Sequence, residues 1–118
     1  TLGALATTAV QALAPGGVNT GMAGDPALPV ARVAVCTGSG GSLVEAARDA
    51  GADAYVTGDL KYHDADAAEG MGLVNMPHGV VEQHALRAWT PALADALAPA
   101  GVPVEFASTS TDPWREAC

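Results

Sequence analysis

The sequence is poor in basic and aromatic residues. It has 5 Lys and Arg against 13 Asp and Glu, a formal net charge of −8 over 118 residues. So few cations argue against binding to the phosphate backbone of nucleic acids. Aromatic residues make up 4% of the chain although hydrophobic residues make up 49%. Because large apolar side chains are scarce, we expect the chain to need a partner surface to complete its core.

Cysteines and long apolar runs are also scarce. The two cysteines, Cys36 and Cys118, form neither a disulfide framework nor a cysteine metal motif. No apolar run approaches the roughly 20 residues of a membrane span, and no charged segment precedes an apolar one as in a signal peptide. We therefore expect a cytoplasmic protein without membrane contact. The chain starts at Thr1 inside a helical pattern, which leaves open that it is a processed or excised fragment.

Hydrophobic periodicity predicts alternating helices and strands. The predicted helices cover residues 1–14, 42–50, 62–69 and 80–98, the last with Pro91 as a kink or break. The predicted strands cover residues 30–36, 54–57, 72–76 and 104–108. Ser42 and Glu45 have the spacing of a capping box.

This order predicts an α/β fold, a layered mixed sheet flanked by helices. The length fits a single domain over residues 1–118. Within it, residues 1–29 form a helix and a Gly/Pro-rich lead-in, which reads as a loop or a short edge strand. Residues 30–114 form the core lobe.

A glycine-rich segment follows the first predicted strand. Gly38, Ser39 and Gly40 lie between that strand and the next helix. Such a turn exposes backbone N–H groups that suit a phosphate, so these residues are candidates for cofactor binding. The full dinucleotide and P-loop motifs are absent, and a tight strand-to-helix turn explains the glycines equally well.

Polar side chains follow the second and third predicted strands, where α/β sheets form their sites. Thr57, Asp59 and His63 combine a hydroxyl, a carboxylate and an imidazole, and are the candidate catalytic residues. The alternative is that Asp59 only caps the next helix. His78 and Glu82 are four residues apart, so on one helix both can bind one metal ion. Their mixed N and O donors suit Zn, Fe, Mn or Co, although such pairs are also common on solvated helices.

Three segments together resemble the carboxyl-terminal half of the Nif-three-like family, whose members include GTP cyclohydrolase 1 type 2 homologues and dinuclear metal-binding proteins. The segments are residues 33–43, residues 51–63 and the pair His78 and Glu82. The tail over 108–114 is similar to that of actinobacterial members. The resemblance implies one lobe of a two-lobed α/β fold that assembles into hexamers of paired trimers.

The resemblance also implies a site. Its metal ligands are a His-His pair and an Asp from the amino-terminal half, and a His and a Glu that correspond to His78 and Glu82. Thr57, Asp59 and His63 would lie beside the metal or contact substrate. Two departures stand out: Pro77 replaces the usual Gly before the metal His, and no adjacent histidines occur among the three present.

Three functions are compatible with this resemblance. The first is half of the site of a metal-dependent hydrolase, GTP cyclohydrolase-like, acting on a nucleotide-like substrate. The second is metal binding or metal delivery without turnover, and the third is an assembly module. The first two expect an amino-terminal lobe or second chain as partner, because two protein ligands are too few for a tight metal site. The assembly module would have a vestigial metal site and bind no metal.

Overall fold

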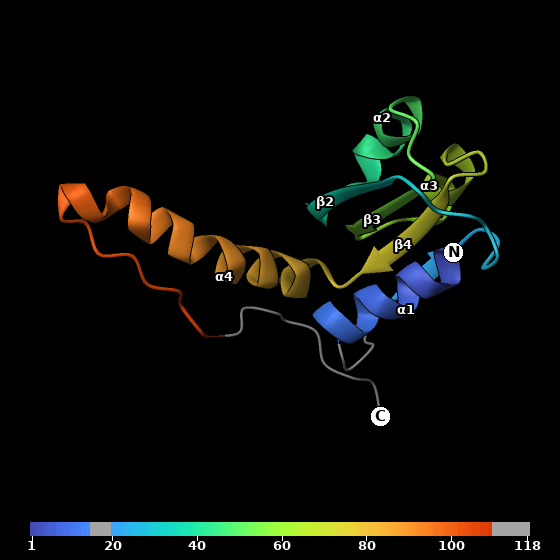
Figure 1. Cartoon of the computed structure of the whole chain (residues 1–118). Helices are drawn as coiled ribbons and strands as arrows, with labels where there is room; N and C mark the ends of the chain where they lie inside the picture. The colour runs from blue at the N-terminus through green and yellow to red at the C-terminus, as the bar shows by residue number, and fades with distance from the viewer. Residues whose placement is uncertain (15–19, 110–118) are drawn as a thin grey trace.

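The computed structural model describes residues 1–14 and 20–109, and these form a four-stranded mixed sheet with helices on both faces (Figure 1). The strands are β1 (Gly21–Ala23), β2 (Val33–Ser39), β3 (Ala54–Gly58) and β4 (Gly72–Met76). The α-helices are α1 (Leu2–Leu13), α2 (Val44–Asp49), α3 (Tyr62–Ala67) and α4 (His78–Leu97), with 3₁₀ turns η1 (Gly41–Leu43) and η2 (Ala98–Ala100). The predicted α/β class is confirmed.

The sheet has the order β1-β4-β3-β2. Strands β2, β3 and β4 are parallel, and β1 pairs antiparallel with β4. Strand β3 is buried along its whole length, as its central position requires. The lead-in over 15–29 was predicted to be either a loop or a short edge strand. It contains the short edge strand β1.

Alternation along the strands builds a core on each side of the sheet. Val56 and Val74 pack with Leu2 and the other apolar residues of α1. Tyr55 and Leu73 face the opposite core, which α2 and α3 cover (Figure 1). The two faces therefore share the few large side chains that the composition offers.

Two local predictions are wrong. The capping box is absent: Ser42 lies inside η1, and α2 begins after Leu43 without a side-chain cap. Residues 104–108 form no strand, because no neighbouring strand pairs with them. That segment instead returns beside α4, where the Arg87 guanidinium lies 5.0 Å from the centre of the Phe106 ring.

Helix α4 starts two residues earlier than predicted and runs unbroken through Pro91. Pro77 stands just before its first residue with φ of −62°, and β4 ends at Met76, in the extended geometry that a following proline favours. The helix contacts β2, β3 and α1 and then extends away from the sheet (Figure 1). Within the described ranges, no helix is long and apolar enough to cross a membrane.

Candidate metal-binding site

Three chain segments converge where the parallel strands β2, β3 and β4 end. They are the loop after β2, the end of β3 and the start of α4. Gly58, the last residue of β3, lies between the loop after β2 and the start of α4. A methyl group added there would lie 2.9 Å from the carbonyl oxygen of Gly38 and 3.0 Å from Cα of His78. Glycine is therefore what lets the loop after β2 approach the start of α4 this closely.

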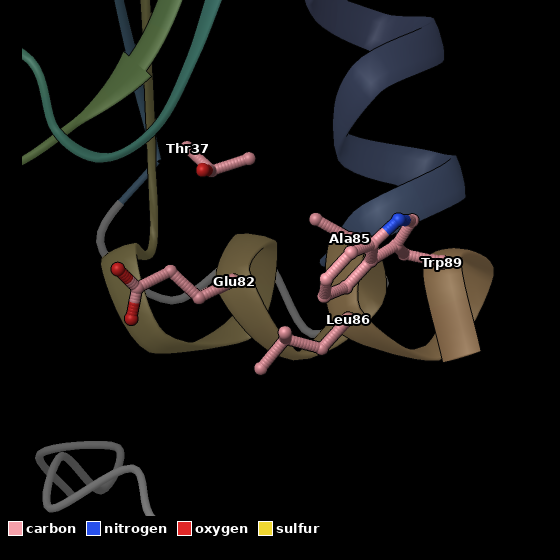
Figure 2. A pocket seen from close by; sticks show the side chains of 5 residues that line it. All are labelled: Thr37, Glu82, Ala85, Leu86 and Trp89. Carbon is pink, nitrogen blue, oxygen red and sulfur yellow. The ribbon is translucent and has the colours of Figure 1, made fainter. Parts of the chain in front are cut away.

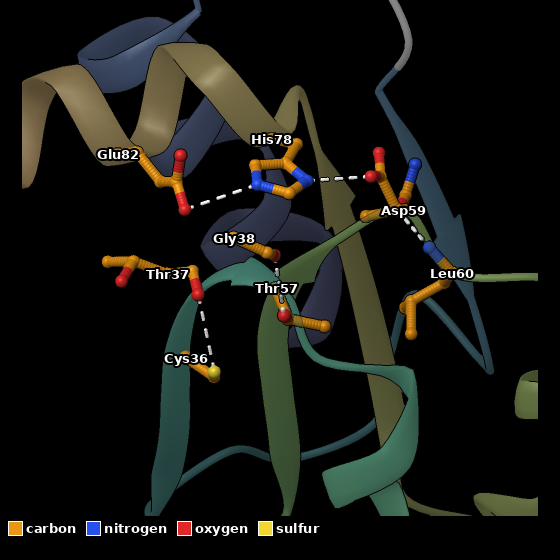
Figure 3. Close-up of polar contacts among 9 residues, drawn as sticks. Cys36, Thr37, Gly38, Thr57, Asp59, Leu60, His78 and Glu82 are labelled. Atoms are coloured by element: carbon orange, nitrogen blue, oxygen red, sulfur yellow. Dashed lines mark hydrogen bonds and ion pairs between the residues drawn. The ribbon is translucent and has the colours of Figure 1, made fainter.

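His78 lies at the centre of this convergence and contacts two carboxylates (Figure 3). Its Nε2 is 3.1 Å from Oε1 of Glu82, one turn along α4, and its Nδ1 is 2.7 Å from Oδ2 of Asp59. Helix α4 begins at His78, two residues before its predicted start, and this start meets the condition for His78 and Glu82 to share one face of the helix. The three side chains are 38%, 49% and 55% exposed, so solvent reaches the group.

The partners of His78 decide its protonation. A carboxylate can only accept a hydrogen bond, so Nδ1 carries the hydrogen that is donated to Asp59. This hydrogen bond raises the pKa of His78 above its ordinary 6.5; partial burial opposes the rise, and the charge of Glu82 adds to it. A second proton, when present, is on Nε2, which lies 3.1 Å from Oε1 of Glu82.

Asp59 reaches His78 from a strained loop. Its φ is +55°, a left-handed conformation that Asp adopts more readily than most residues. The next amide, the N–H of Leu60, donates to Oδ1 of Asn75 at 2.9 Å, which ties the loop to β4. The loop therefore presents the carboxylate to the imidazole rather than to the amino end of α3, and the capping alternative is not what the structure has.

The glycine-rich loop packs against the same group. Gly38 has φ of +78°, and a methyl group on it would lie 2.7 Å from Oε1 of Glu82 and 3.3 Å from Nε2 of His78. A methyl group on Gly40 would overlap the hydroxyls of Thr57 and Tyr55. These two glycines therefore permit close packing, and the cofactor-binding role of Gly38, Ser39 and Gly40 remains a prediction. Ser39 between them is exposed.

Two buried hydroxyls donate hydrogen bonds to the backbone of this loop. Thr57 is fully buried and donates from Oγ1 to the carbonyl oxygen of Gly38 at 3.3 Å (Figure 3). The Tyr55 hydroxyl donates to the carbonyl oxygen of Gly40 at 3.1 Å, and burial raises the pKa of Tyr55. Thr57 thus orients the loop, and its predicted catalytic role gains no support from its position.

His63 is separate from the group. Its side chain is 73% exposed, and its ion pair is with Asp64, 3.8 Å away. Asp64 in turn accepts the N–H of Lys61 at 2.6 Å and caps α3. His63 therefore belongs to the solvent face of α3, and its catalytic role remains a prediction.

Two candidate metal ligands lie together among the described residues. Among residues 1–14 and 20–109, no three His, Cys, Asp or Glu side chains are placed to hold one ion. Asp59 contacts the opposite edge of the imidazole, so Nε2 of His78 and the carboxylate of Glu82 remain the candidate metal ligands. Sequence reasoning named all three residues, but it missed that Asp59 acts on His78, because the two are 19 residues apart.

Comparison with known protein families identifies the family of this chain. The sequence model of Duf34/NIF3 (NGG1p interacting factor 3) matches residues 1–113. The chain belongs to the DUF34/NIF3 family. The Nif-three-like resemblance drawn from the motifs is therefore confirmed.

Relatives in this family are considerably longer. A GTP cyclohydrolase 1 type 2 homolog of Mycobacterium tuberculosis is 38% identical over 110 residues, which is 88% of this chain and 28% of that protein. The homolog of Streptomyces coelicolor is 34% identical over 93% of this chain and 40% of its own length. The DUF34/NIF3 chain described here thus spans about a quarter to two-fifths of these curated relatives.

Solved structures of NIF3-related proteins share the fold. A Bacillus cereus protein related to NIF3 superposes with a TM-score of 0.81 at 30% identity, over 99% of this chain and 33% of that one. Staphylococcus aureus protein SA1388 gives 0.84 at 28% identity, over 99% and 38%. The lobe is therefore a recurring part of larger DUF34/NIF3 proteins.

Proposed function

We propose that this lobe contributes two ligands, His78 Nε2 and a Glu82 carboxylate oxygen, to a divalent metal site. The observation that carries the proposal is the 3.1 Å separation of these two atoms. Two ligands at 2.0–2.2 Å from one ion lie about 3.0–3.4 Å apart, depending on the coordination geometry. The separation of the two atoms is therefore within the range expected for two ligands of one ion.

The protonation of His78 supports the same assignment. With Nδ1–H donated to Asp59, Nε2 is left as the acceptor nitrogen, 3.1 Å from a carboxylate oxygen of Glu82. Two acceptors facing each other need a cation between them, either a proton or a metal ion. A carboxylate on the far nitrogen of a metal-binding imidazole fixes its tautomer and strengthens its basicity, which is the part that Asp59 would have.

The remaining ligands come from outside the described residues. An amino-terminal lobe, on the same longer protein or on a second chain, would complete the coordination of a Zn, Fe, Mn or Co ion. A homo-oligomer such as the hexamer that the family resemblance implies would hold these lobes together. The relatives are more than twice as long as this chain, which is consistent with a second lobe.

The finer proposal is a hydrolase that acts on a nucleotide-like substrate. A divalent metal in the site would supply Lewis-acid chemistry for hydrolysis. The chain's own residues would hold the ligand set: Asp59 orients His78, and Thr57 keeps Gly38 against Glu82. Proton transfer by Asp59 or His63 would need either side chain to leave its present partner.

The second candidate is metal binding or delivery without turnover. It is favoured by the same contacts, because Thr57 is buried, Asp59 is engaged by His78, and His63 pairs with Asp64. Within the described residues, no predicted acid or base stands free beside the metal ligands. A turnover assay on the metal-loaded protein with GTP separates the two candidates, since only the hydrolase releases product.

Isothermal titration with Zn²⁺, together with elemental analysis, tests the metal proposal. The full chain should bind zinc, and His78→Ala and Glu82→Ala should each weaken binding at least tenfold. His63→Ala and His84→Ala are the matched controls, because they remove the other two histidines. Equal zinc binding by the His78 and Glu82 variants and the wild type would overturn the ligand assignment.

A further inference from the structure

The two carboxylates beside His78 depend on the backbone to different degrees. Glu82 has a long side chain on α4 and borders a pocket of about 420 Å³ between the end of β2 and that helix, so it has space to change its rotamer. The other residues that line this pocket are Thr37, Ala85, Leu86 and Trp89 (Figure 2). Asp59 has a short side chain on a loop, so the loop backbone decides where its carboxylate lies. Whatever fixes that backbone also fixes the 2.7 Å contact between Asp59 and His78.

We infer that Asn75, on β4, is the positioning residue that holds the Asp59 carboxylate against His78. Its side-chain Oδ1 accepts the N–H of Leu60, the residue directly after Asp59, at 2.9 Å. The inference rests on the proposed function for its purpose, because Asp59 orients His78 there, but the contact itself needs no metal ion. The sequence gave no sign of this role, since Asn75 lies inside a predicted strand and 15 residues from Leu60.

The backbone of Asp59 needs support from both sides. Its φ of +55° lies in the left-handed region, which a residue other than glycine keeps only where its surroundings impose it. Before it, Gly58 is enclosed, because three backbone atoms lie within about 3.0 Å of the place where a Cβ would be. After it, the hydrogen bond from Leu60 to Asn75 fixes the next peptide. The strained residue therefore lies between two fixed points, and Asn75 provides the second.

Strand β4 relates the two partners of the contact to each other. Asn75 is flanked in the sheet by Thr57 of β3 and Gly21 of β1, so strands on both sides fix its backbone. His78 follows three residues later, as the first residue of α4. One strand therefore leads into the imidazole and also carries the side chain that holds the Asp59 loop. Asn75 thus sets the position of Asp59 relative to His78.

The fold itself depends less on this hydrogen bond than the contact does. Asn75 and Leu60 are only partly buried, and both line a second pocket, of about 230 Å³. In Asn75→Ala a water molecule in this space can accept the N–H of Leu60. Water satisfies the donor but does not tie the peptide to β4. Asp59 can then leave the left-handed region, and its carboxylate withdraws from His78.

Long-range ¹H–¹⁵N NMR of the zinc-free full chain tests the inference. The spectra are recorded in alkaline buffer, where each imidazole is neutral and has one ring hydrogen. In the wild type, Nδ1 of His78 should carry this hydrogen, because Asp59 accepts it. In Asn75→Ala the preference should be lost, and the ring nitrogens of His78 should shift toward the averaged values of the exposed His84.

Two further variants separate positioning from general destabilisation. Asn75→Asp keeps an acceptor oxygen at the same place and should retain the wild-type signals of His78. Asp53→Ala is the matched control, because it removes a side-chain acceptor of backbone N–H groups at the amino end of β3. It should be less stable in chemical denaturation and leave the His78 tautomer unchanged. If Asn75→Ala does not fold, Asn75→Ser replaces it, since its polar side chain is too short to reach Leu60.

Two results would overturn the inference. The first is a folded Asn75→Ala or Asn75→Ser variant in which Nδ1 of His78 still carries the hydrogen. The second is a folded Asn75→Asp variant that loses this preference as Asn75→Ala does. Both are measured without zinc, so neither outcome affects the assignment of His78 and Glu82 as metal ligands. Conversely, failure of these two residues to bind zinc would overturn the proposed function and leave the role of Asn75 intact.

Discussion

Replacing Gly38 with Ala should damage the metal site far more than it damages the fold. Gly38 has φ of +78°, so an alanine there adopts a left-handed backbone that costs about 1–2 kcal/mol. The new methyl group would also lie 2.7 Å from Oε1 of Glu82. That oxygen is the end of a flexible side chain, so its displacement adds little to the cost of folding.

The displacement is large on the scale of metal coordination. Ordinary contact begins at 3.4 Å, so the Glu82 oxygen must retreat by about 0.7 Å from the methyl group. Metal–ligand distances are tolerated within about 0.2 Å, and loss of ligand orientation typically lowers metal affinity 10–100-fold. We therefore expect Gly38→Ala to weaken zinc binding by at least tenfold.

Gly101→Ala is the matched control. Gly101 has φ of +68°, and a methyl group there would meet nothing within 4 Å. Chemical denaturation should show a similar loss of unfolding free energy for both variants, while calorimetry should show weaker zinc binding for Gly38→Ala alone. Equal zinc affinity of the two variants would refute the placement of Gly38 against the metal ligands.

Three further substitutions test other parts of the structure. Asp59→Asn tolerates the left-handed backbone but loses the charge on His78, so zinc affinity measured by calorimetry should fall 10–100-fold with little change in unfolding; unchanged affinity would exclude an orienting role. Leu2→Ala empties a fully buried position against Gly72, and urea denaturation should show a loss of about 2–5 kcal/mol. The N–H groups of Arg32 and Ala31 lower the pKa of Asp53 below 3.8, so its carboxylate stabilises the fold above that pH. Asp53→Asn should therefore have a lower melting temperature than wild type at pH 7, a difference that shrinks as the pH falls below about 4; a constant difference would contradict this.

Local patterns in the sequence were sufficient for most elements of the fold. Apolar periodicity predicted the helix over 1–14 and the buried strands that became β3 and β4, because their burial pattern depends on their own residues. The residues of segment 104–108 are typical of a strand, but no neighbouring strand pairs with them. Whether a partner strand lies beside a segment depends on the rest of the fold and not on the segment's own residues. Ser42 has capping chemistry, but the chain first makes a 3₁₀ turn there.

The site was predictable where spacing along one helix was enough. His78 and Glu82 share a face of α4 because they are four residues apart. The contact from Asp59 depends on β3 and β4 being adjacent and parallel, which the sequence could only suggest. Trp89 was missed as a pocket residue, because a helical stripe of apolar residues usually indicates packing into a core.

In the proposed site a metal ion binds Nε2 of His78. Long-range ¹H–¹⁵N NMR resolves the ring nitrogens of all three histidines during a zinc titration. Nε2 of His78 should shift to the range of a coordinated nitrogen while Nδ1 keeps the hydrogen donated to Asp59. Zinc-dependent shifts at His63 or His84 with His78 unchanged would contradict it.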